Sequence, residues 1–137
     1  MKKPLKYNKK YQRKSSSEKI KDKIRYQIRK ITKKYPKIKQ KIKNIKDLEK
    51  KLYYAMVWEV TELQPYYILD NSDKRGWKNY HLDHICSISV GYHNNIPPEL
   101  IGNIKNLQFL HYKENIDKGY KVELHILKEM LKKSKKY

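Results

Sequence analysis

The sequence predicts an α+β protein in which basic helices precede a small unit of two strands and a helix. Isoleucines recur at helical intervals of three or four residues over much of the stretch between positions 20 and 45. Two later runs, "WKNYHLDHICSIS" and "LQFLHY", have the composition of strands. Residues 1–51 contain 22 Lys and Arg against 4 Asp and Glu, whereas residues 52–137 contain 12 against 10. The first third is therefore expected to form a basic extension.

The overall composition fits one modest domain plus that extension. The chain has 137 residues, 38% of them hydrophobic, which permits a core. No apolar run approaches the roughly 18 residues that span a bilayer. The N-terminus also lacks the apolar segment of a signal peptide, so we expect a cytoplasmic protein without a membrane partner. Cys86 is the only cysteine, which excludes an internal disulfide and favours a small buried side chain.

The basic first third predicts a polyanionic partner. Such a block of like charges becomes favourable when it replaces counterions along nucleic acid, and double-stranded DNA is the expected partner. An acidic membrane surface is the alternative, but the isoleucine pattern lacks the Trp, Phe and Leu of an interfacial anchor. The abundance of Lys, Ile, Asn and Tyr also suggests an AT-rich coding sequence, which raises the lysine content for reasons unrelated to binding.

The first part of the extension divides into an arm and a helix. Residues 1–14 have no apolar period and are expected to form a disordered basic arm. Ser15 and Glu18 match the capping box that begins a helix, and Pro36 ends that helix. Its apolar stripe consists of Ile20, Ile24, Ile28 and Ile31. The cationic residues of this helix that we expect to contact DNA are Lys19, Lys23, Arg25, Arg29, Lys30 and Lys33.

Two more helical patterns complete the extension, which spans residues 15–64. Their apolar positions are Ile38, Ile42 and Ile45, then Leu48, Leu52, Met56 and Leu63, and a single continuous helix through both is an option. The stretch "LYYAMVWEV" also fits a buried strand, but its Ala, Met and Glu favour a helix. Pro65 ends the pattern, so residues 65–137 are predicted to form a second domain.

Residues 65–137 alternate between turn signals and short elements. The turn cluster "NSDKRG" precedes the first strand, and the polar stretch "VGYHNN" after it is expected to be a loop. Prolines at 97–98 predict a short helical turn that ends at Gly102, before the second strand. A helix is expected over residues 113–118, ended by Gly119. The last amphipathic helix runs through Val122, Ile126, Met130 and Leu131.

The polar residues of this second part follow the order of a known motif. The stretch "HLDHI" contains the neighbouring Asp83 and His84, and "NLQFLHYKENIDKG" contains two asparagines nine positions apart, Asn106 and Asn115. In this order and spacing, residues 80–121 resemble the HNH nuclease family, whose core is the ββα-metal fold. They look most like small phage-borne members, including homing endonucleases. The 22 positions from His84 to Asn106 make a longer loop than that of compact members.

The resemblance implies a divalent-metal-dependent DNA endonuclease. His84 would be the general base facing the attacking water, Asp83 and Asn115 the metal ligands, and Asn106 the residue that holds the loop. A neutral imidazole titrates close enough to physiological pH to accept a proton from water. One carboxylate and one carboxamide leave most of an octahedral sphere to water and phosphate, which favours Mg²⁺ or Mn²⁺. The alternative is a non-catalytic nucleic-acid-binding protein built on the same scaffold.

Three other residues have two interpretations each. His81 shares the strand face of Asp83 and is either an additional or supporting group of the metal site or an ordinary hydrogen-bonded histidine. Lys118 follows Asn115 by three positions and either binds a DNA phosphate or is solvated. His111 stands where some relatives carry a zinc-binding cysteine, so no structural zinc is expected here. Monomer and homodimer, DNA and RNA, and homing and packaging roles all remain compatible with the sequence.

Overall fold

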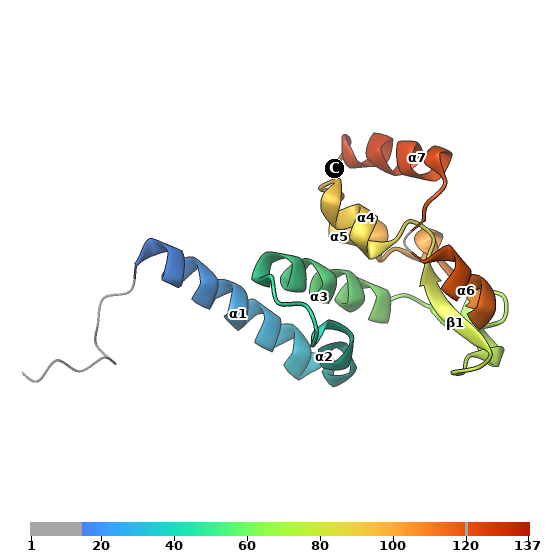
Figure 1. Ribbon diagram of the computed structural model, residues 1–137, viewed down its shortest axis with the longest axis horizontal. Coiled ribbons are helices and arrows are strands. Elements are labelled where there is room, and N and C mark those ends of the chain that lie inside the picture. Colours follow the sequence, from blue (N-terminus) through green and yellow to red (C-terminus); the bar gives the residue numbers. More distant parts are fainter. Residues whose placement is uncertain (1–14, 120) are drawn as a thin grey trace, which may run out of the picture.

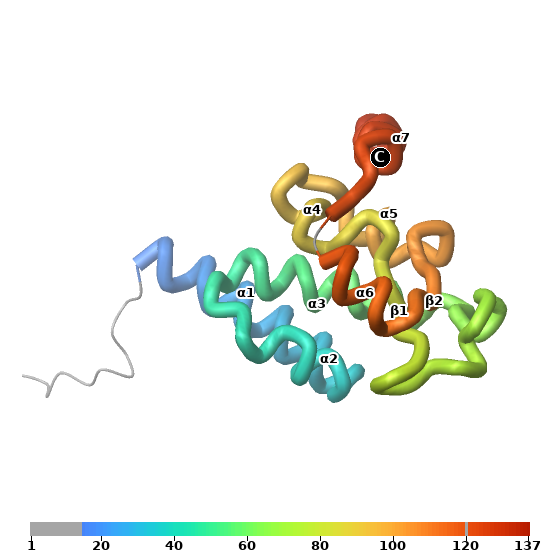
Figure 2. Tube along the Cα trace, turned by 45° about the vertical axis from the view of Figure 1, so that its right-hand side comes forward, coloured from blue at the N-terminus to red at the C-terminus, as the bar shows by residue number. Residues whose placement is uncertain are grey.

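A computed structural model describes residues 15–119 and 121–137 (Figures 1 and 2). These residues form an α+β fold that is mostly helical and contains one sheet of two antiparallel strands. The arm expected at residues 1–14 lies outside the described residues. None of the helices in the described part combines the length and the apolarity that crossing a bilayer requires.

The first helix, α1 (Ser16–Lys34), begins and ends where local signals place it. The hydroxyl of Ser15 accepts a hydrogen bond from the backbone N–H three residues later at 3.2 Å, which confirms the predicted start. The helix ends before Pro36, as the sequence predicted. Ile28 and Ile31 of the apolar stripe are buried, whereas the first isoleucine of the stripe is 57% exposed. The N-terminal turns of α1 extend past the neighbouring helix in Figure 1, so this end of the stripe has less to pack against.

Two separate helices follow, α2 (Pro36–Ile42) and α3 (Leu48–Glu62). One continuous helix is therefore the wrong alternative, because Asp47 starts α3 anew. Its carboxylate accepts a hydrogen bond from the backbone N–H of Lys50 at 3.0 Å. The helix predicted for "LYYAMVWEV" is confirmed. The three helices pack around an apolar cluster, termed here the first core, of Ile28, Ile31, Ile38, Ile42 and Ala55.

A run of short elements connects α3 to the second strand. In order these are η2 (Tyr66–Ile68), η3 (Ser72–Lys74), β1 (Tyr80–His84), α4 (Ile88–His93), α5 (Pro98–Ile101) and η4 (Ile104–Asn106). The strand predicted over residues 77–89 is thus too long, and the loop predicted for "VGYHNN" is wrong because its first four residues belong to α4. The hydroxyl of Ser87 accepts from the backbone N–H of Val90 and begins this helix. The short turn at α5 is confirmed.

The sheet and the helix that follows it have the expected order of strand, strand and helix. β1 pairs with β2 (Leu107–His111) so that Asp83 lies opposite Gln108 and His84 opposite Leu107. α6 (Tyr112–Lys118) follows directly and packs against both strands (Figure 1). Gly119 ends α6 with a φ of 51°, a left-handed conformation that glycine adopts without strain.

α3 lies between two apolar cores. The second core consists of Val57, Cys86, Ile88, Ile96, Ile101 and Met130, the last from α7 (Leu124–Ser134). Figures 1 and 2 both show α4 and α5 between α3 and α7, with α1 and α2 on the opposite side of α3. A β-carbon at Gly102 would lie 2.7 Å from the carbonyl oxygen of Val57, so α5 approaches the backbone of α3 closely. Tyr54 and Trp58 of α3 pack against both cores.

Candidate functional site

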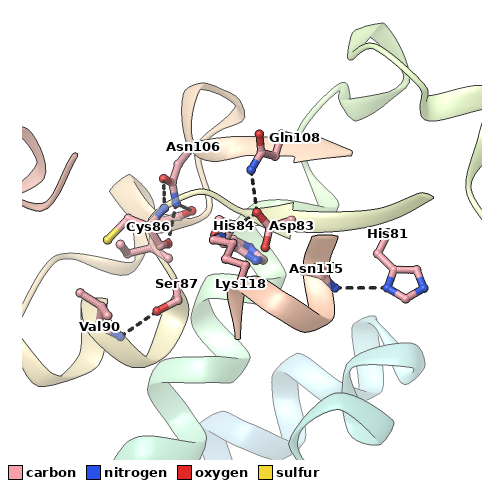
Figure 3. Close-up of polar contacts among 11 residues, drawn as sticks. His81, Asp83, His84, Cys86, Ser87, Val90, Asn106, Gln108, Asn115 and Lys118 are labelled. Atoms are coloured by element: carbon pink, nitrogen blue, oxygen red, sulfur yellow. Dashed lines mark hydrogen bonds and ion pairs between the residues drawn. The ribbon is translucent and has the colours of Figure 1, made fainter. Parts of the chain in front are cut away.

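The side chains of Asp83 and His84 lie at the end of β1 and contact different elements (Figure 3). Asp83 is hydrogen-bonded to β2 and α6, whereas His84 is hydrogen-bonded to α3. Neighbours on a strand point to opposite faces, so this divergence follows from strand geometry. Both side chains are buried, and His84 is only 6% exposed. Any shared chemistry must therefore take place where the strand ends, since the two side chains do not share a face.

Thr61 of α3 determines which nitrogen of His84 carries the proton. The Oγ1 atom of Thr61 lies 2.8 Å from the carbonyl oxygen of Val57 and 3.0 Å from Nε2 of His84. A hydroxyl has one hydrogen, and here it is donated to the carbonyl, so the same oxygen must accept from the imidazole. Nε2 of His84 therefore carries the proton. Nδ1 is left as the nitrogen that can accept one.

The surroundings of His84 keep the imidazole neutral. Trp58 stands edge-on against it, with the ring centroids 4.9 Å apart. Burial, followed by the positive charges of Lys118 and Lys41, lowers the pKa of His84 to about 3. The ring is thus mostly enclosed, with little of its surface open to solvent, in contrast to the expectation for a base that faces a water. Within the described residues every fully buried side-chain nitrogen or oxygen has a hydrogen-bond partner. Nδ1 has none among them, so it retains contact with solvent.

A lysine ammonium group sits on the carboxylate of Asp83. Nζ of Lys118 lies 2.7 Å from Oδ2 of Asp83 and 2.6 Å from the carbonyl oxygen of His84. The side chain of Gln108 donates to the same Oδ2 at 2.8 Å, across the strand pair. Both bonds go to Oδ2 and neither uses Oδ1. Lys118 therefore binds the protein's own oxygens and is not the solvated lysine of the second interpretation, whereas binding of a DNA phosphate stays a prediction.

Asn115 is oriented by His81. The backbone carbonyl of Trp77 can only accept, so Nε2 of His81, 2.7 Å away, is the donor. Nδ1 of His81 is then an acceptor, and the amide nitrogen of Asn115 donates to it at 3.2 Å (Figure 3). The bond uses the nitrogen of Asn115 and leaves its carboxamide oxygen as the remaining acceptor. His81 thus makes ordinary hydrogen bonds that also position a predicted metal ligand.

Asn106 holds together the two ends of the loop between the strands. Its Oδ1 accepts from the backbone N–H of Cys86 at 2.8 Å, and its Nδ2 donates to the carbonyl oxygens of Cys86 and Ile101 at 3.0 and 2.7 Å. The side chain is buried, so all three bonds are shielded from water. These bonds fix the backbone directly after His84.

The oxygens near the end of β1 suit a hard divalent cation. They are the carboxylate of Asp83 and the carbonyl of His84, and hard cations such as Mg²⁺ prefer oxygen ligands. The carboxamide of Asn115 is bonded to His81, nearer the start of the strand. The Lys118 ammonium already occupies two of these oxygens as a monovalent cation. Among residues 15–119 and 121–137, no three His, Cys, Asp or Glu side chains gather into a metal-binding group. A cation here would thus rely on water and on a phosphate for its other ligands.

The cations predicted to contact DNA and the remaining histidines lie apart from this cluster. All six cationic residues predicted to contact DNA are exposed on α1, and Arg25 is also bonded to Asp22 at 3.1 Å. His111 accepts from a backbone N–H at the start of α6 and stacks edge-on with Tyr80. His93 is exposed and bonded to a backbone carbonyl. His125 is exposed and near Glu123.

Sequence reasoning missed Thr61, Trp58 and Gln108. Thr61 has a weak signal, because it is a polar residue four positions after Val57 within an apolar helix. Gln108 is two positions after Asn106 in the motif, but its bond to Asp83 depends on the strand register. Nothing in the sequence pairs Trp58 with His84, since the two are joined only by the packing of α3 against β1.

Comparison with protein-family models, with curated proteins and with solved structures gives no match to this chain. The residues of the site therefore carry the functional argument alone.

Proposed function

We propose that this chain is a divalent-metal-dependent endonuclease that hydrolyses phosphodiester bonds in DNA. The observation that carries the proposal is the arrangement at the end of β1. There a histidine with a fixed tautomer stands next to a carboxylate whose charge is balanced by a cation. The order of two strands and a helix, with Asn106 behind the histidine and Asn115 on the helix, supports the same reading.

His84 is the general base of this proposal. Nδ1 takes the proton of the attacking water, and Thr61 keeps the ring in place through Nε2. This assignment satisfies the usual relation in which a base is itself oriented by a third group. Asn106 prevents the backbone after His84 from moving away from the phosphate.

Asp83 and Asn115 would hold the divalent ion, which supplies charge to stabilise the phosphate in the transition state when bound. Lys118 must release Oδ2 of Asp83 or share it, because the ammonium and the ion use the same oxygens. Once displaced, the lysine is beside the phosphate that the ion binds. The ammonium therefore keeps the carboxylate paired until substrate and ion arrive.

The low pKa of His84 means that the described form is not the reactive one. Its largest cause is burial, so a shift of α3 away from β1 would raise the pKa toward its ordinary value. The second cause is the charge of Lys118 and Lys41, which a bound phosphate would offset. DNA binding is thus expected to bring the base toward the pH range where it works best.

The test is nicking of supercoiled plasmid DNA in the presence of Mg²⁺ or Mn²⁺. His84→Ala, Asp83→Ala and Asn115→Ala should each lower the rate by about 100-fold or more. His125→Ala, which removes an exposed histidine, is the matched control and should cleave as wild type. A folded His84→Ala protein that retains wild-type cleavage would exclude His84 as the base. Replacing the plasmid by a structured RNA shows whether RNA is the better substrate.

A non-catalytic nucleic-acid-binding protein is the second candidate. It is favoured by the enclosure of His84 and by the neutralisation of Asp83 through Lys118. In that case DNA binds with a steep salt dependence, yet no cleavage occurs with either metal ion. Metal binding by the free protein, measured by calorimetry with Mn²⁺, would then also be absent.

A further inference from the structure

A cleft of about 440 Å³ opens beside the candidate site, between the N-terminal helices and the sheet. Its walls come from α2, α3, the turn before β1, β1 itself and α6, and Asn115 lies at its edge. The volume falls within the range of about 300–1,000 Å³ that is usual for ligand sites. Trp58 both lines the cleft and contacts His84, so the ring of Trp58 separates a molecule in the cleft from the imidazole.

The cleft contains an exposed tryptophan whose backbone is held in place. The side chain of Trp77 is 86% exposed, the largest value among the exposed large hydrophobic residues of the described chain. Its carbonyl oxygen accepts the 2.7 Å hydrogen bond from His81, and the neighbouring Gly76 donates to the carbonyl of Tyr80 at 3.1 Å. The backbone around Trp77 is thus held by hydrogen bonds, and the solvent-facing ring offers a flat apolar surface on which a ligand can stack.

Two cations, Lys41 and Arg75, line the cleft together with Trp77, and none of the described carboxylates does. Lys41 lies with Nζ 4.0 Å from the centre of the Trp58 ring, and Arg75 lies 5.5 Å from that of Tyr66. Burial, then repulsion from Arg75, lowers the pKa of Lys41, and Lys37 adds to the repulsion while Glu62 opposes it. An anion between these cations would relieve the repulsion. The cleft therefore pairs an aromatic face with unmet positive charge.

We propose that this cleft binds an unpaired nucleotide of a nucleic-acid strand, with the base stacked on Trp77 and the phosphate between Lys41 and Arg75. Every base has a π-face that stacks on an aromatic ring, and nearby lysine and arginine side chains follow the backbone of single strands. Bases within a duplex are already stacked on one another and cannot present that face. That the ligand is a nucleic acid rests on the proposed function. The inference adds that one unpaired nucleotide of that substrate occupies the cleft beside the candidate site.

The test is binding of a fluorescein-labelled oligothymidylate, measured by anisotropy in EDTA so that no cleavage occurs. Trp77→Ala should weaken binding by about tenfold, as expected for the loss of one stacked base, and leave the salt dependence unchanged. Trp77→Phe should restore most of the affinity. Tyr67→Ala, which removes an exposed aromatic residue outside the cleft, is the matched control and should bind as wild type.

Two further measurements separate the stacking from the charge. Arg75→Gln should lower the slope of log K against log salt by about one, since one phosphate contact disappears. A blunt duplex without unpaired bases should bind wild type and Trp77→Ala equally. Equal affinity of the two proteins for oligothymidylate would overturn the proposal. The proposal would also be overturned if Trp77→Ala lost affinity only for vesicles of anionic lipid, because Trp77 would then bind a membrane surface.

These results are independent of the nuclease test. If Trp77→Ala binds oligothymidylate more weakly but wild type shows no metal-dependent cleavage, nucleotide binding in the cleft is supported and nuclease activity is rejected. If wild type cleaves DNA but Trp77→Ala binds oligothymidylate as wild type does, nuclease activity is supported and nucleotide binding in the cleft is rejected.

Discussion

The cations of α1 and Lys118 near the end of β1 differ in their exposure to solvent. On α1 the six cationic residues predicted to contact DNA are exposed, and Arg25 is paired with an acidic residue one turn earlier. Near β1, Lys118 is enclosed, with a side chain only 18% exposed, and Lys41 is crowded by other cations. Exposed charges are screened by salt and act through their number. An enclosed charge such as that of Lys118 acts through its exact neighbours. Single substitutions should therefore matter little for stability on α1, whereas substitution of Lys118 should have a large effect.

The largest loss of stability is expected from Asn106→Ala, which disrupts buried hydrogen bonds in the loop between β1 and β2. It removes three buried hydrogen bonds and leaves backbone groups of Cys86 and Ile101 without partners, at a loss of about 4 kcal/mol in the free energy of unfolding. Urea denaturation measures the change. Asn94→Ala removes a single bond at an exposed residue and is the control, with a loss below about 1 kcal/mol. Similar losses in the two variants would contradict the role of Asn106.

The second-largest loss of stability is expected from Lys118→Met, because this substitution leaves the Asp83 carboxylate without its cation. With Gln108 still bonded to the carboxylate, we expect a loss of about 3 kcal/mol in the free energy of unfolding. The same variant should bind Mn²⁺ at least about tenfold more tightly, since the competing ammonium is gone. Calorimetry measures the affinity. Lys113→Met on the same helix is exposed and should change neither quantity, and unchanged Mn²⁺ affinity in Lys118→Met would argue against a cation site at Asp83.

The pH dependence of stability tests the enclosure of His84. Its pKa is about 3 in the folded chain and roughly 6.5 when unfolded, so the unfolded chain binds the extra proton between these values. The stabilisation is therefore complete above pH 6.5 and lost as the pH falls toward 3, by about 1.4 kcal/mol per pH unit. Measured in EDTA, His84→Gln should lose this part of the slope and His125→Gln should keep it. Equal slopes for wild type and His84→Gln would show that the imidazole is not enclosed.

The smallest effect on stability is expected on α1. Changing Lys19, Lys23, Lys30 and Lys33 together to Gln should alter the free energy of unfolding by less than about 0.5 kcal/mol per substitution, because the side chains are exposed. The salt slope of DNA binding should nevertheless fall by about one for each phosphate contact removed. Point substitutions are preferable to deleting the helix, because Ile28 and Ile31 belong to the first core. An unchanged salt slope would show that α1 does not contact DNA.

Local signals predicted the elements that local forces decide. Ser15 and Pro36 bound α1 through a hydrogen bond and a steric clash that involve near neighbours only. The same reasoning failed for α4, where the apolar alternation of "ICSISV" resembles a strand. There Ser87 is a local cap that the strand interpretation overlooked, and packing adds to it. A β-carbon at Gly91 would lie 2.6 Å from the hydroxyl of Tyr53, so Gly91 allows the helix to approach α3 closely.

The structure brings the predicted site residues into one region, but through contacts that the sequence did not predict. The spacing in the sequence named Asp83, His84, Asn106 and Asn115, and the two strands and α6 bring them into one region. The partner of His84 lies 23 positions earlier in the chain, and the partner of Asp83 lies 35 positions later. Contacts of this range depend on how α3 and α6 pack against the sheet, which no local pattern encodes.

The position of α3 has a consequence for how the molecule unfolds. Ala55 belongs to the first core and Val57 to the second, and Tyr54 and Trp58 pack against both. We therefore expect that the boundary predicted after residue 64 separates two stretches of sequence but not two cooperative units. Heating should melt both cores in a single calorimetric peak whose van't Hoff and calorimetric enthalpies agree. A fragment that begins at residue 65 would lack the helix that completes its interior.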